Sequence, residues 1–205
     1  MTTFPGSPKL QKGSLVAIDQ TTGQRTEIAF QYNPDTLTRR LTAQMATSNF
    51  DRNEALRLKG PPQETISLEI EIDATDQLEK QDSTATSLGI HPRLAALEVL
   101  IYPQSTVVND NENLAAQGVI ELIPLEAPLT LFVWGKKRTV PVRLTSFSIT
   151  EEAFDPNLNP IRAKVSLELS VLNYYDLGFD TDGGNVFMTY HQDKESLAQQ
   201  NSNTP

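Results

Sequence analysis

Hydrophobic and polar residues alternate along residues 64–73, "ETISLEIEID", and again along residues 163–172, "AKVSLELSVL". From Ile66 to Ile72 every second residue is aliphatic, and the residues between are Ser or Glu. A period of two places the apolar side chains on one face of a strand and the polar side chains on the other. Both segments are therefore predicted to be antiparallel strands that are buried on one face.

An N-terminal hairpin is predicted from two further apolar runs. "SLVAID" at 14–19 and "EIAFQYNP" at 27–34 are separated by a polar loop that contains Gly23, and Pro34 ends the second run because it cannot donate a ladder hydrogen bond. Residues 129–149 predict two more strands on either side of Gly135. These segments together indicate a sheet of antiparallel strands.

In the second of the strands around Gly135, the apolar residues switch from even-numbered to odd-numbered positions. Val140, Val142 and Leu144 share one parity, whereas Phe147 and Ile149 share the other. An extra residue in a strand produces such a switch, so we expect a bulge or bend near Thr145.

One helix is predicted between the strands, over residues 89–103, "GIHPRLAALEVLIYP". Its leucines recur at three-residue spacing, and Pro92 lies near its start. The polar stretches 74–89 and 104–118 beside it are typical of long surface loops. The chain is therefore predicted to have a mainly β (α+β) fold, an antiparallel barrel or sandwich with one helix between strands.

The alternation fades after Leu172, which divides the chain into a β domain at 1–172 and a partly flexible extension at 173–205. In the extension, "GFDTDGGN" at 178–185 favours a turn or hinge, residues 186–200 favour a short amphipathic helix, and the last five residues favour a disordered end. Phe187 and Tyr190 belong to an apolar cluster that we expect to dock on another component.

Charge limits the partners of the chain. It contains 26 acidic and 17 basic residues, for a net charge of −9, which disfavours nucleic acid and anionic membranes. It has no cysteine, and no stretch approaches the roughly 18 to 20 apolar residues of a membrane span. We expect a protein that is made in the cytoplasm and does not insert into a membrane.

Signatures of catalysis or metal binding are weak. "DTDGGN" at 180–185 superficially resembles a calcium loop, but Gly184 and Asn185 stand where an acidic or amide residue and a glycine are required. His91 and His191 are far apart, and no phosphate loop, zinc signature or nucleophile elbow occurs. The chain is predicted to be non-enzymatic and to use no metal or cofactor.

The strongest local signal is "VWGKKR" at 133–138, in which the only tryptophan, Trp134, precedes Lys136, Lys137 and Arg138. Three interpretations stay open. Trp134 could end a strand before a solvated hairpin tip, it could stack on a sugar as in a β-sandwich carbohydrate-binding module, or the basic tip could contact an acidic protein surface.

Several segments in order resemble one protein family. They are "FQYNPDTLTRRL" at 30–41, "LEIEIDATDQLE" at 68–79, "GIHPRLAALEVLIYP" at 89–103, and the run from 131 to 172 that contains the Trp-Gly step and "FDPNLNPIRA". Over roughly residues 10–172 the chain resembles the N-terminal domain of contractile injection system tube and baseplate-hub proteins. That family belongs to phage-tail-like particles.

The resemblance implies a tail-tube-like β barrel in a ring of six, which forms an adaptor layer between the spike or baseplate hub and the inner tube. The implied partners are copies of the chain itself, the spike or hub protein, the inner tube protein and baseplate components. Many members continue into a LysM module, for which residues 173–205 are too few and too polar. Assembly would take place in the cytoplasm, and the particle could afterwards be released or held at a membrane.

Overall fold

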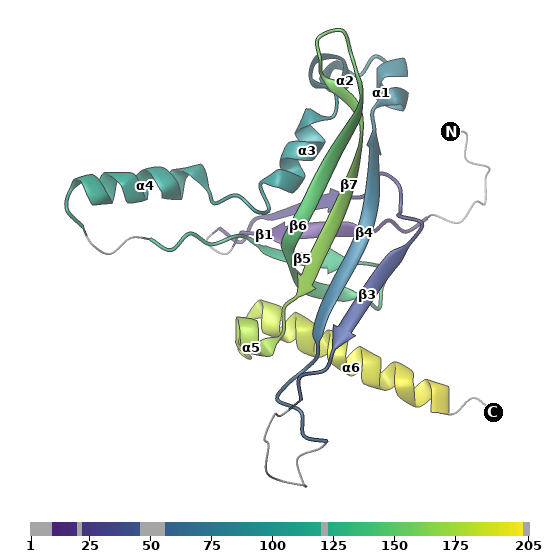
Figure 1. The fold of residues 1–205 in the computed structure, drawn as a ribbon, viewed down its shortest axis with the longest axis vertical. Coiled ribbons are helices and arrows are strands. Elements are labelled where there is room, and N and C mark those ends of the chain that lie inside the picture. Colours follow the sequence, from purple (N-terminus) through teal and green to yellow (C-terminus); the bar gives the residue numbers. More distant parts are fainter. Residues whose placement is uncertain (1–9, 20–21, 46–55, 120–122, 203–205) are drawn as a thin grey trace.

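The fold is a single antiparallel sheet with helices on its concave side. A computed structural model describes residues 10–19, 22–45, 56–119 and 123–202. Seven strands pair in the order β2-β1-β5-β6-β7-β4-β3 (Figure 1). The strands are β1 Ser14–Ile18, β2 Arg25–Ala29, β3 Leu37–Thr42, β4 Gln63–Asp73, β5 Leu129–Val133, β6 Thr139–Phe154 and β7 Pro160–Val171. The helices are α1 Thr75–Glu79, α2 Ser83–Leu88, α3 His91–Glu98, α4 Ser105–Ala116, α5 Tyr174–Leu177 and α6 Asp182–Ser202.

The two alternating segments form the centre of the sheet, as predicted. β4 and β7 pair so that Ile66 lies opposite Leu169 and Ile70 opposite Val165, and all four side chains are buried. Leu94 and Leu97 of α3 belong to the same hydrophobic cluster. The apolar faces of the two strands therefore meet the helix, and the polar faces remain in solvent.

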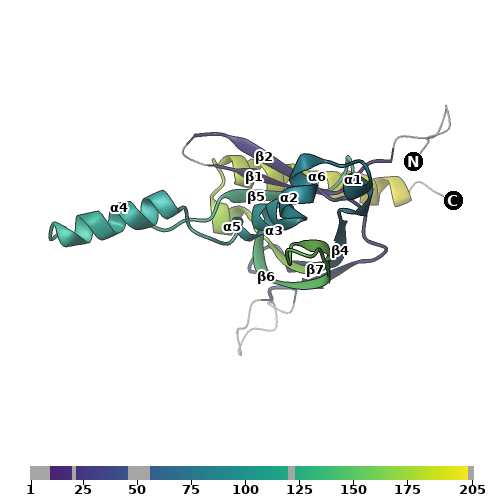
Figure 2. The same ribbon diagram turned by 90° about the horizontal axis from the view of Figure 1, so that it is seen from above.

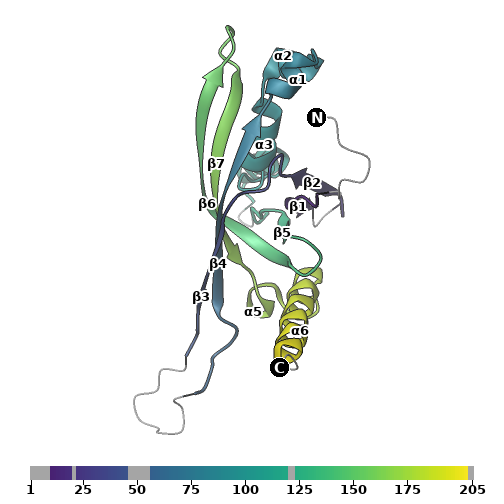
Figure 3. The ribbon, with the colours of Figure 1, turned by 90° about the vertical axis from the view of Figure 1, so that its right-hand side faces the viewer.

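The predicted N-terminal hairpin is confirmed as β1 and β2, and the strands around Gly135 are confirmed as β5 and β6. The pairing of β6 with β7 shifts between Leu144 and Ser146, which is the bulge predicted near Thr145. Figure 3 shows the consequence: β1, β2 and β5 turn away from the plane of β3, β4 and β7, and β6 bends between the two parts.

The predicted mainly antiparallel β architecture is confirmed, but the sheet does not close into a barrel. β2 and β3 stand at opposite ends of the strand order and do not pair with each other. The concave side of the bent sheet is filled by α3 and α6, so the apolar face is covered without closure (Figure 3). An open sheet retains two free edges.

The expectation of one helix between strands was wrong, because four helices separate β4 from β5. α1 and α2 occupy the stretch predicted as a loop at 74–89, and α4 occupies the loop predicted at 104–118. Apolar periodicity could not reveal them, since α1 and α4 bury no residue and α2 buries only Ala85. α2 starts with a cap instead, in which the Asp82 carboxylate accepts hydrogen bonds from two backbone amides.

The C-terminal segment is folded onto the sheet. The predicted turn at 178–185 contains the start of α6, which extends over 21 residues and packs against β6. The Gly-Gly pair permits this approach, because a Cβ atom on Gly184 would lie 2.0 Å from the carbonyl oxygen of Gly178. Of the expected disordered end, residues 203–205 lie outside the described residues.

Candidate functional site

Trp134 closes the end of β5. Its amide donates a hydrogen bond of 2.7 Å to the Arg138 carbonyl across a turn in which Gly135 has a φ of +69°. The indole stacks on Phe132 with 6.0 Å between ring centroids and an interplanar angle of 14°. Gly13 lies so close to the indole that an added Cβ atom would be 2.5 Å from Cε3. Trp134 is therefore a strand-end residue with one ring face covered, which disfavours stacking on a sugar.

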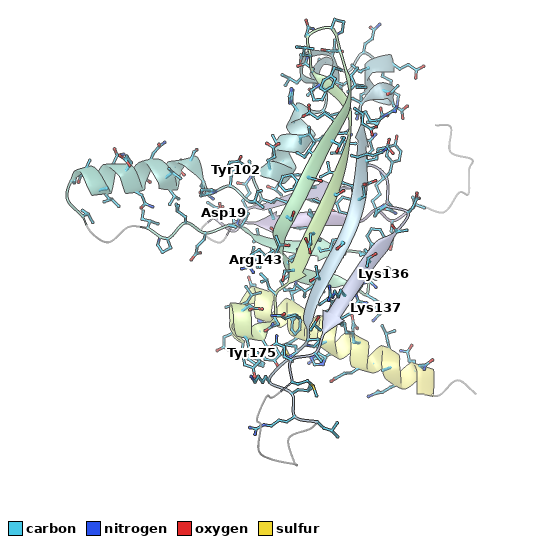
Figure 4. All side chains as sticks on the ribbon, viewed as in Figure 1. Asp19, Tyr102, Lys136, Lys137, Arg143 and Tyr175 are labelled. Carbon is cyan, nitrogen blue, oxygen red and sulfur yellow. The ribbon has the colours of Figure 1, made fainter. Side chains whose placement is uncertain are left out.

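The basic tip, Lys136, Lys137 and Arg138, divides between solvent and the chain's own C-terminal helix. Lys136 is exposed (Figure 4). Lys137 forms an ion pair of 2.9 Å with Asp193 of α6. Part of the tip therefore holds α6 in place, and Lys136 is the charge that is presented outward.

Phe187 and Tyr190, expected at an interface with another component, are buried within the subunit at 6 % and 4 % exposure. Phe187 contacts the ring of Tyr174 edge-on at 5.9 Å. The apolar cluster that suggested docking is therefore covered by this chain's own sheet and α5. The structure brings the basic tip and this cluster together through α6.

Sequence reasoning missed a buried carboxylate under α6. Glu64 of β4 is 4 % exposed and accepts hydrogen bonds from Arg39 at 2.6 Å, from the Tyr190 hydroxyl at 3.1 Å and from Lys194 at 3.1 Å. The sequence did contain a signal for this burial. Glu64 lies two residues before Ile66, so it falls on the same face of β4 as the buried aliphatic residues. A carboxylate in phase with a buried row requires partners on the inner face.

The charge on Glu64 is stabilised despite its burial. Burial alone would raise the pKa of the Glu64 carboxyl, but the attraction of Lys194 and the hydrogen bond from Arg39 outweigh it and lower the pKa below its ordinary value. Burial and the neighbouring Glu64 carboxylate raise the pKa of Tyr190 to about 12. The Lys194 ammonium also lies 3.9 Å from the centroid of the Tyr190 ring. This cluster joins β3, β4 and α6.

The outer face of the long strands is polar, and several of its charges are paired. Arg162 donates a hydrogen bond of 2.7 Å to Asp73, and Lys164 lies 3.1 Å from Glu152. Burial alone would raise the pKa of the Asp73 carboxyl, but hydrogen bonds from Thr75 and Arg162 outweigh it and lower the pKa below its ordinary value. In the part of the chain that the structure describes, no three His, Cys, Asp or Glu side chains gather where they could hold a metal ion. None of the helices in that part is long and apolar enough to cross a membrane.

The layer of β6, β7, β4 and β3 has a free edge on each side. β5 pairs with β6 only from Thr139 to Val142, so the rest of β6 has no described strand on the side away from β7. β3 pairs with β4 alone among the described strands. Unpaired backbone groups at such edges are templates for pairing with another strand.

A helical arm extends from the body beside β6 (Figures 1 and 2). The arm consists of α4 and the returning segment 123–126, which are joined because the Asn111 amide binds both backbone groups of Ile123 at 2.7 and 2.8 Å. No residue of α4 is buried. Val107, Asn111 and Leu114, on the side of α4 that meets the returning segment, are half-buried, and most of the other residues of the helix are exposed.

A groove of about 770 Å³ lies between edge strand β2 and α3. Phe30, Ile72 and Leu97 form its apolar floor, and all three are buried. Lys12 and Tyr32 line it as well. Among the described residues, the groove is an apolar surface that stays open.

Comparisons with known proteins identify one family and two solved structures of low similarity. The family model described as "Contractile injection system tube protein" matches residues 9–176. A chain in the tail of an empty gene transfer agent particle with C6 symmetry is 16% identical, over 78% of this chain and 90% of that chain, with a TM-score of 0.31. A chain in the virion of a native gene transfer agent particle is 14% identical over the same shares, with a TM-score of 0.30. No curated protein sequence matches the chain.

Proposed function

Since the chain belongs to the contractile injection system tube protein family, whose members are structural components of phage-tail-like particles, we propose that it forms a ring of six copies between the spike or baseplate hub and the inner tube. The observation that carries the proposal is the layer of β6, β7, β4 and β3 with a free edge on each side. Pairing β3 of one copy with the free part of β6 in the next removes both edges, because a closed cylinder has none.

In such a ring the polar face of the layer lines the lumen. Glu69 and Glu71 are exposed on this face, and lateral pairs such as Lys164 with Glu152 reduce its charge density. Water in the lumen keeps these groups solvated, and the apolar face stays against α3 and α6. A sheet with one polar and one apolar face thus supports a hydrated channel with a rigid wall.

The function is mechanical under this proposal. One face of the ring would match the spike or hub, and the other would set the register of the first inner tube ring. The protein would be assembled in the cytoplasm and act as a component of the particle. Its partners would be its own copies, the spike or hub protein, the inner tube protein and baseplate components.

Electron microscopy of the purified protein tests the proposal. We expect six-fold rings in negative stain at high concentration, and we expect antibodies to detect the protein in purified particles. A protein that stays monomeric at every concentration and is absent from particles would contradict the proposal. Disruption of β-edge pairing by Thr38→Pro in β3 should abolish rings, whereas the exposed Thr106→Ala in α4 should not.

A further inference from the structure

We propose that the arm of one copy docks into the groove between β2 and α3 of the neighbouring copy. The inference rests on the proposed ring, because only a head-to-tail arrangement supplies a groove to every arm. It adds a second contact, on the outer side of the ring, to the strand pairing at the lumen. The evidence comes from the arm, the groove, their charges and their positions.

The described residues of the same chain cover only one side of the arm. Isolated helices shorter than about 12–15 residues are marginal in water, and α4 has 12 residues, many of them poor helix formers such as Ser, Thr, Val and Asn. Its Val108 is 43 % exposed, and Ile123 and Leu125 in the returning segment are 44 % and 56 % exposed. Burial of these aliphatic groups would stabilise the helix.

The groove supplies the matching apolar surface. Its floor of Phe30, Ile72 and Leu97 is continuous with the hydrophobic core, and Ala29 and Tyr32 expose their side chains at its rim. Pockets of roughly 300 to 1,000 Å³ accept ligands that bury several apolar groups, and this groove falls in that range. The apolar face of a short helix is an occupant of the right kind.

Charge favours one direction of docking. Residues 104–128, which contain the arm, include four acidic residues and no Lys or Arg. Lys12 lines the groove, and its neighbour Gln11 approaches Gly135 in the turn that carries exposed Lys136. Glu27 and Asp76 also line the groove, so apolar burial would supply the affinity and the basic edge would orient the acidic arm.

The positions of the two surfaces suit a ring. The arm leaves the body on the side of β6, whereas the start of the described chain and Lys136 lie on the side of β3 (Figures 1 and 4). Pairing β3 with the β6 of a neighbour would bring that neighbour's arm toward the groove. The same rotation therefore satisfies both contacts, as a closed head-to-tail ring requires.

Cysteine cross-linking tests the contact, because the chain has no cysteine of its own. A Val108→Cys chain and an Ala29→Cys chain are mixed under ring-forming conditions and treated with a short bismaleimide. We expect a cross-linked dimer only in the mixture, and a ladder up to six copies from the double variant. Asn109→Cys, on the same helix but pointing elsewhere, is the matched control and should cross-link at least tenfold more slowly.

The outcomes separate this inference from the proposed function. Rings that form without any link between positions 108 and 29 would overturn the arm contact and leave the ring intact. A double variant that links only within one chain would overturn it as well. Absence of rings for every variant would contradict both proposals. As a second readout, Val108→Asp should raise the concentration needed for rings roughly tenfold, whereas Asn109→Asp should not.

Discussion

The hydroxyl of Tyr190 donates a hydrogen bond of 3.1 Å to the carboxylate of Glu64, two residues 126 positions apart in the chain. The same hydroxyl accepts a hydrogen bond of 3.0 Å from Arg39. This contact fastens α6 to the edge of the layer that we propose to line the lumen. The C-terminal helix is therefore part of the framework that holds β3 in position.

Removal of that hydroxyl should destabilise the subunit. Tyr190→Phe leaves the ring packed but deprives Glu64 and Arg39 of a partner, so we expect a loss of about 2 kcal/mol in the free energy of unfolding. Urea denaturation followed by circular dichroism measures the loss. Tyr102→Phe, at a tyrosine that is 63 % exposed, is the control and should leave stability unchanged. Equal stabilities of Tyr190→Phe and the wild type would contradict the proposed fastening.

Stability should depend on pH through Glu64. The pKa of Glu64 in the folded protein is lower than its ordinary value of 4.5, so its contribution is present above that pH and is lost as the pH falls through the folded pKa. Asp73 has a lowered pKa too and contributes in the same direction. We therefore expect progressive destabilisation as the pH falls below about 5.

Glu64→Gln isolates the share of Glu64 in this pH dependence. The variant should be less stable than the wild type at neutral pH and should lose less stability on acidification, since residue 64 no longer titrates. Thermal melting across the acidic range measures both effects. Glu151→Gln, at an exposed position of β6, should retain the wild-type dependence. Parallel pH curves for Glu64→Gln and the wild type would show that Glu64 does not carry the effect.

Close packing at the start of α6 predicts an effect of one methyl group. In Gly184→Ala the new Cβ atom would meet the Gly178 carbonyl, a backbone atom that can retreat only if the turn shifts. Overpacking of this kind costs about 1–3 kcal/mol. Asn185→Ala, one residue later and exposed, is the matched control and should be neutral or slightly stabilising. Chemical denaturation of both variants is the measurement.

Substitutions in the basic tip should affect assembly and stability to different degrees. Lys136→Glu changes an exposed charge and should leave the melting temperature unchanged while ring or particle assembly is reduced. Lys137→Glu also breaks the pair with Asp193, so it should weaken the attachment of α6 as well. Lys59→Glu, at an exposed position beyond β3, controls for net charge. Particles that assemble normally with Lys136→Glu would count against a contact at the tip.

Local patterns predicted much of this fold. The strands β4 and β7 were readable because each is buried on one face, and the bulge in β6 was readable because it switches the parity of an apolar row. The turn after Trp134 followed from a glycine next to charged residues. In each case the signal lies within about ten residues, where the backbone period alone decides which side chains share a face.

Contacts between distant segments decided the rest. The partners of Glu64 come from two distant parts of the chain, because Arg39 lies in β3 whereas Tyr190 and Lys194 both lie in α6. Closure of the sheet also depended on distant packing, because α3 and α6 occupy the space that a barrel would enclose.

The sequence by itself therefore determined where six of the seven described strands lie, which face of β4 and β7 is apolar, and where the charged turn lies. It did not reveal β3, which buries none of its residues and so carries no clear apolar alternation. Only the tertiary structure decided that the sheet stays open, that Phe187 and Tyr190 are covered by their own subunit, and that α4 extends from the body with none of its residues buried. The physical reason is that periodicity reports whether a side chain is buried, whereas its partner is set by how far-apart elements pack.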